Sequence, residues 1–168
     1  MNKVVQELKA KTEGAWGNLT AQLPGMEPHL EQSDAPGEWT TREVLSHLLF
    51  REGFRLVDLL KTFSRRDYPL FELTPGDTAM TPARRTMTLH QLTDALDAQR
   101  KGAFAYLEAL PEADLAERKI QIPLFKEFMG TDEISLAMFT GAMFDFHWND
   151  HAGQLAKIRK AVGLPDAR

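Results

Sequence analysis

Apolar residues recur at helical spacings of three, four and seven positions in four long segments of this chain. In residues 2–23 they fall on one face of a helix, and similar stripes run through residues 41–63, 89–110 and 132–162. An amphipathic helix must bury its apolar stripe against another element. Four such helices in one chain therefore predict an all-α protein, most simply a four-helix bundle.

Capping signals separate these segments. Thr40 is followed three residues later by Glu43, and Thr88 by Gln91. A hydroxyl residue with Glu or Gln three positions on is the pattern of a capping box, which predicts a helix start at each place. Thr131 is the candidate N-cap of the last helix, because acidic residues follow it in the positive first turn.

Two connections differ from the short links of a simple bundle. Residues 64–87 contain three prolines and a glycine, and a link of this length inside a compact domain usually crosses the bundle or serves a site. Ile120, Ile122 and Leu124 alternate with polar or turn residues, which predicts a short extended stretch. No repeat or domain linker interrupts the sequence, so we expect residues 1–168 to form a single domain.

Charge and hydropathy narrow the expected partners. The chain has 20 Lys and Arg residues against 24 Asp and Glu residues, a formal net charge of -4, whereas binding along a nucleic-acid backbone needs a basic surface. The most apolar stretch, residues 134–144, is about half the length that crosses a bilayer. The N-terminus has charges where a signal peptide needs an apolar run. We expect a cytoplasmic protein that binds neither nucleic acid nor membranes.

The chain contains no cysteine and five histidines. The lack of cysteine excludes a disulfide, a thiolate zinc site and a cysteine nucleophile, so a transition-metal site would consist of histidines and carboxylates. His147 and His151 lie one helical turn apart and interrupt an apolar stripe, at the spacing by which a helix offers two nitrogens to one metal ion. His47, on or near the buried face of the second helix, is the candidate third ligand.

Three histidine ligands would leave an open coordination position, which is typical of a catalytic site. The spacing by itself leaves a second interpretation open, in which these are core histidines with polar partners. Asp145 and Asp150 are candidate acceptors for imidazole N–H groups or solvated charges on the opposite face, and Asp150 is also a candidate general base. His29, in a proline-rich loop, and His90, in a first helical turn, are expected at the surface.

Two segments resemble the DinB/YfiT-like metal-binding four-helix bundles. Residues 37–48, Gly-Glu-Trp-Thr-Thr-Arg-Glu-Val-Leu-Ser-His-Leu, are similar to that family's entry into its second helix. Residues 146–155, Phe-His-Trp-Asn-Asp-His-Ala-Gly-Gln-Leu, are similar to the H-x-x-x-H-x-x-Q motif of its last helix. The resemblance implies an up-down-down-up topology with a long second-to-third connection, and it maps the family's metal ligands onto His47, His147 and His151.

The same resemblance implies a divalent ion (zinc, nickel or iron), a homodimer and a small-molecule substrate. Some members of the family are transferases that use a low-molecular-weight thiol, and others are assigned hydrolase activity, so we expect a metal-dependent enzyme of one of these kinds. Since the chain has no cysteine, a thiol nucleophile would come from a cosubstrate. The alternatives are a non-catalytic protein of the same fold that sequesters a small molecule or confers stress resistance, and a structural dimer without a working site.

Overall fold

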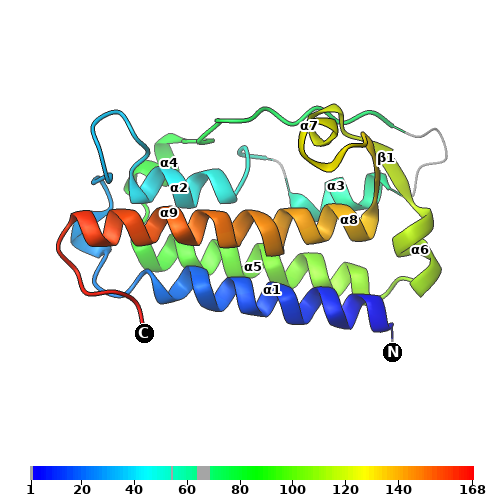
Figure 1. Ribbon diagram of the computed structural model, residues 1–168, viewed down its shortest axis with the longest axis horizontal. Coiled ribbons are helices and arrows are strands. Elements are labelled where there is room, and N and C mark those ends of the chain that lie inside the picture. Colours follow the sequence, from blue (N-terminus) through cyan, green and yellow to red (C-terminus); the bar gives the residue numbers. More distant parts are fainter. Residues whose placement is uncertain (1, 54, 64–68) are drawn as a thin grey trace.

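The computed structural model describes residues 2–53, 55–63 and 69–168, and Figure 1 shows that its long helices lie side by side. This confirms the predicted all-α four-helix bundle. The four members are α1 (Lys3–Ala21), the pair α2 (Thr41–Leu48) and α3 (Leu56–Thr62), α5 (Leu89–Glu108), and a last member in which α8 (Leu136–Gly141) continues through a π-helical turn (Ala142–Phe146) into α9 (His147–Ala161).

The four members run up-down-down-up. In Figure 1, α1 and α8–α9 run toward the left of the view, whereas α2–α3 and α5 run toward the right. Two consecutive members that run in the same direction need a connection that returns along the whole bundle. The chain after residue 69 makes this crossover along the outer side of α2 and reaches α4 (Pro82–Thr86), directly before α5. The predicted long crossing connection is therefore confirmed over residues 69–87, while residues 64–68 of the predicted range lie outside the described part of the chain.

The predicted caps form where the sequence indicates them. The Thr40 hydroxyl accepts from the Glu43 N–H at 3.2 Å, and the Glu43 carboxylate accepts from the Thr40 N–H at 2.8 Å. Thr88 and Gln91 form the same reciprocal pair at the start of α5. These bonds satisfy N–H groups that a helix leaves without partners in its first turn.

The single helix predicted over residues 41–63 is wrong, because the chain breaks between α2 and α3. Phe50 has a φ of 62° and Gly53 a φ of 75°, both in the left-handed region that ends a helix. The guanidinium of Arg84 donates to the carbonyl oxygens of Ser46 and Phe50, at the end of α2. The sequence does not reveal the break, because the apolar stripe continues on both sides of it.

The last helical member begins at Leu136 rather than at residue 132. The Ser135 hydroxyl accepts from the Met138 N–H at 3.2 Å and is the N-cap, whereas the Thr131 hydroxyl accepts from the Glu133 N–H within a loop. Ahead of this helix a two-stranded antiparallel sheet pairs Ile120 with Ile134. It consists of β1 (Lys119–Gln121) and β2 (Glu133–Ser135).

The predicted extended stretch is therefore present at residues 119–121, but the chain turns helical before it reaches Leu124. The short elements around the sheet close one end of the bundle (Figure 1). They are α6 (Glu112–Glu117), a 3-10 turn (Pro123–Phe125) and α7 (Lys126–Met129), while a 3-10 turn (Glu27–His29) lies at the other end.

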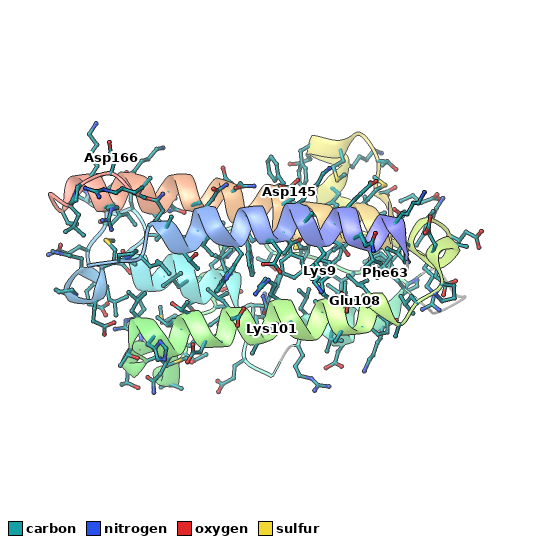
Figure 2. All side chains as sticks on the ribbon, turned by 90° about the horizontal axis from the view of Figure 1, so that it is seen from below. Lys9, Phe63, Lys101, Glu108, Asp145 and Asp166 are labelled. Atoms are coloured by element: carbon teal, nitrogen blue, oxygen red, sulfur yellow. The ribbon has the colours of Figure 1, made fainter. Side chains whose placement is uncertain are left out.

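The apolar stripes meet in one core. Its largest fully buried side chains include Trp148, Phe139, Phe144 and Phe63. On the side of the bundle away from the crossover, Lys9 of α1 and Glu108 of α5 lie next to each other (Figure 2). The Lys9 Nζ is 2.5 Å from the Glu108 carboxylate. Exposed ion pairs of this kind contribute little to stability, so burial of the stripes holds the bundle together. None of the described helices is long and apolar enough to cross a membrane.

The two candidate N-caps of the sequence can be separated by their stability. We expect Thr40→Ala to lower the free energy of unfolding by about 1 kcal/mol, because the hydroxyl that accepts from the Glu43 N–H is lost. Thr131→Ala removes only a loop contact and should change it by less than about 0.5 kcal/mol. Urea unfolding followed by circular dichroism measures both, and an equal loss in the two variants would contradict the assignment.

Candidate metal centre

Three histidines from two members of the bundle meet at one point. His47 lies in the last turn of α2, and His147 and His151 lie one turn apart at the start of α9. Their potential ligand nitrogens lie within 4.8 Å of one another, and the Nε2 atoms of His47 and His147 are 2.9 Å apart. The structure thus brings together the three residues that the sequence singles out.

The outer nitrogens of the His47 and His151 rings each have a partner of their own. His47 Nδ1 lies 2.6 Å from the carbonyl oxygen of Asp77, and His151 Nδ1 lies 2.8 Å from Oε1 of Gln154. Because a carbonyl oxygen can only accept, the proton of a neutral His47 is on Nδ1 and the lone pair is on Nε2. The hydrogen bonds therefore direct acceptor nitrogens toward the centre of the trio.

Burial keeps two of the rings neutral at ordinary pH. It lowers the pKa of His147 from 6.5 to about 3, with a smaller contribution from the neighbouring His151 and His47, while a hydrogen bond to the Met143 backbone opposes the shift. Burial also lowers the pKa of His151, against the opposing effect of Gln154. Neutral imidazole is the form that binds a metal ion, so the site needs no proton loss to offer these ligands.

The donor set fits a divalent cation. The Nε2 atoms of His47 and His147 are 2.9 Å apart, close enough to share a proton in the metal-free protein and to bind one cation together when neither carries a proton. Imidazole nitrogen is a ligand for zinc, nickel and iron alike, and three protein ligands leave a position for water or substrate. The three histidines can therefore hold a divalent metal ion with an open position.

Trp39 packs over the trio from the loop before α2. Its ring lies 4.9 Å from the His47 ring and stacks on the His151 ring at 6.1 Å with an interplanar angle of 7°. The next residue, Thr40, begins the capping box, so the start of α2 fixes the Trp39 backbone as well. The indole shields one side of the histidines from water.

A cavity of about 480 Å³ opens beside the three histidines. Its volume falls in the range of pockets that hold small molecules. Apart from the histidines and Trp39, its walls are mainly apolar and come from four parts of the chain. They are the end of α2, the crossover (residues 71–79), the segment 124–128 and the π-helical turn before α9.

The other candidate residues of the sequence lie elsewhere. Asp150 is exposed and does not line the cavity, and Asp145 accepts a hydrogen bond from the Asn149 side chain. His90 is exposed beside Asp94, and His29 is bonded to Gln32 in the loop before α2. Neither of these histidines belongs to the trio.

Sequence reasoning missed Asp77 and Arg84, which hold the crossover against α2. The Asp77 carboxylate accepts from the Ala79 N–H at 2.8 Å and from Arg51 Nε at 3.0 Å, and these contacts lower its pKa. Arg84 joins the Ala79 carbonyl oxygen, at 2.8 Å, to the end of α2. The Pro-Gly before Asp77 signals a turn, but nothing in the sequence indicates that this turn contacts His47.

Comparison with known proteins places the chain in a family. The family model of the DinB superfamily matches residues 6–155, and a search of curated proteins found no match. Among solved structures, YfiT from Bacillus subtilis, described as "a probable metal-dependent hydrolase with an unusual four-helix bundle topology", is 17% identical. The alignment covers 96% of this chain and 89% of that chain, with a TM-score of 0.72, which shows a shared fold. Because the family model spans most of its length, the chain belongs to the DinB superfamily.

Proposed function

We propose that this protein is a metal-dependent enzyme that acts on a small molecule and holds its divalent ion with His47, His147 and His151. The observation that carries the proposal is the convergence of three imidazole nitrogens at the wall of a cavity. The description of YfiT as a probable metal-dependent hydrolase supports hydrolysis as the reaction. The coordination chemistry agrees, since three histidines leave a position open.

A divalent ion bound here would supply Lewis-acid activation of water or of a carbonyl group. The chain's own residues then have separate tasks. The Asp77 carbonyl oxygen and the Gln154 side chain orient two of the rings. The apolar walls of the cavity hold the substrate beside the histidines and exclude bulk water, which strengthens electrostatic interactions in the site.

A transferase that uses a low-molecular-weight thiol is the second candidate. Because the chain has no cysteine, the thiol of such a transferase would have to be a cosubstrate. Zinc, nickel and iron are the ions to test, because imidazole binds each of them. A homodimer, a cytoplasmic location and a single domain over residues 1–168 stay predictions, as does the alternative of a sequestering protein without turnover.

Elemental analysis of untagged protein tests the metal site. We expect one divalent ion per chain and a loss of affinity greater than roughly 100-fold in His47→Ala, His147→Ala and His151→Ala, since even outer partners of a metal site account for roughly 10–100-fold. His29→Ala and His90→Ala are the matched controls and should retain the ion. Loss of the ion in His90→Ala, or its retention in His147→Ala, would contradict the assignment.

The buried histidines also predict how the metal-free protein responds to acid. The folded-state pKa of His147 is about 3, below its unfolded value of about 6.5, so the unfolded chain binds more protons between these values. Stability is therefore full above pH 6.5 and falls as the pH drops toward 3, by up to about 1.4 kcal/mol per pH unit for each such proton. Urea unfolding in the presence of a chelator should show a flatter dependence in His147→Gln, and an unchanged one in His90→Gln.

Two carboxylates can be compared as the general base. Asp150 is the sequence prediction but lies outside the cavity, whereas the exposed Glu72 lines it. A general base must come within hydrogen-bond reach of the attacking water, and its loss typically lowers the rate by about 10²–10⁴. We expect a loss of this size in Glu72→Gln and not in Asp150→Asn, measured as kcat of the metal-loaded protein on p-nitrophenyl esters. The reverse pattern would assign the role to Asp150.

A further inference from the structure

The cavity beside the histidines has walls of aromatic and aliphatic side chains. These walls come from segments far apart in the sequence, so the apolar character belongs to the assembled site and not to one helix stripe. The crossover supplies Phe71 and Leu73, the segment before and within α7 supplies Leu124, Phe125 and Phe128, and the π-helical turn supplies Ala142, Met143 and Phe146.

The charges of the described lining are paired or lie at its edge. Arg51 is the cation among these residues, and its Nε lies 3.0 Å from the Asp77 carboxylate while Nη2 donates to Thr74 at 3.2 Å. Glu72 is exposed and negative. The lining therefore offers no unpaired cation to an anionic ligand, and Glu72 would repel one.

Two phenylalanines of the lining are exposed to solvent. Phe128 is 56% exposed and Phe146 is 68% exposed, whereas Phe125, Phe139 and Phe144 are buried. Each Å² of apolar surface left in water lacks roughly 25 cal/mol of the free energy that burial would contribute. Exposed apolar groups that continue into a cavity are typical of a ligand-binding surface.

We propose that this site takes an uncharged molecule with an aromatic or alkyl body. Its body lies between Phe128, Phe146 and the inner apolar walls, and its one polar group points toward the three histidines. The position of the polar group rests on the proposed function, but recognition of the body does not need a metal ion. Apolar burial supplies the affinity for the body, and the described side chains of the lining offer no unpaired cation that would favour an anion in the metal-free protein.

A matched pair of fluorescent probes tests this on the full-length, metal-free protein. N-phenyl-1-naphthylamine is uncharged, and 8-anilino-1-naphthalenesulfonate has the same ring system with an added sulfonate. We expect the uncharged probe to bind with a Kd at least tenfold lower, measured by fluorescence enhancement. Equal or tighter binding of the sulfonate, or no binding of either probe, would overturn the proposal.

Neighbouring substitutions in α7 locate the bound probe. Phe128→Asp should weaken binding of the uncharged probe at least tenfold, and Phe146→Asp, in the π-helical turn, should do the same. Met129→Asp is the matched control, because Met129 is 36% exposed in the same helix but does not line the cavity. It should change the Kd less than twofold. An equal effect of Met129→Asp, with circular dichroism unchanged, would place the probe outside the cavity and overturn the proposal.

The failure of this proposal can be distinguished from that of the proposed function. Wild-type protein stripped of its divalent ion by a chelator should bind the uncharged probe with a Kd within threefold of that of the metal-loaded protein. Wild-type protein that binds the probe but no divalent ion would refute the metal centre alone. Wild-type protein that binds the ion but not the probe would refute the substrate class alone. A second copy of the chain could instead cover Phe128 and Phe146. Size-exclusion chromatography would then show a dimer that Phe128→Asp dissociates, and the probe would not bind to this dimer. That result would also overturn the proposal.

Discussion

The need to give partners to three imidazoles, those of His47 and His147 half-buried and that of His151 buried, governs the arrangement of this bundle. A neutral histidine has one donor and one acceptor, and both require partners where water is excluded. The donor of His47 reaches the crossover at Asp77, and that of His151 reaches Gln154 one turn further along α9. The acceptors are left to face one another. The site is therefore polar at its centre and apolar around it, which is the arrangement that a metal ion stabilises.

The course of the crossover follows from this need. Arg84 bonds to the end of α2 and to Ala79, and the Asp77 carboxylate closes a turn onto the Ala79 N–H. Ala79 has a φ of 51° and Phe50 a φ of 62°, conformations that cost of order 1–3 kcal/mol each and persist only where the surroundings impose them. Both lie at the edge of the cavity, so the backbone is strained where the chain has to enclose the site.

Much of the fold could be predicted because its determinants are local. The apolar stripes of α1 and α5 and the capping boxes at Thr40 and Thr88 depend on residues three or four positions apart, and these predictions are confirmed. The break after α2 could not be predicted, since its cause is a bond from Arg84, more than 30 residues away. The prediction of Thr131 as the N-cap of the last helix is wrong for a related reason. The Thr131 hydroxyl accepts from the Glu133 N–H in a loop, and Ser135 is the N-cap instead.

The sequence by itself determined which side chains would face inward from each helix, and so singled out His47, His147 and His151. Helical spacing fixes the face on which a residue lies, but not the neighbour that this face meets. Only the tertiary structure decided that the three rings share one point, that a carbonyl oxygen of the crossover sets the His47 tautomer, and that apolar walls from four segments enclose the adjoining cavity. Those features depend on contacts between residues up to 100 or more positions apart, such as that of His47 with His147, which arise when the helices pack and the crossover closes over them.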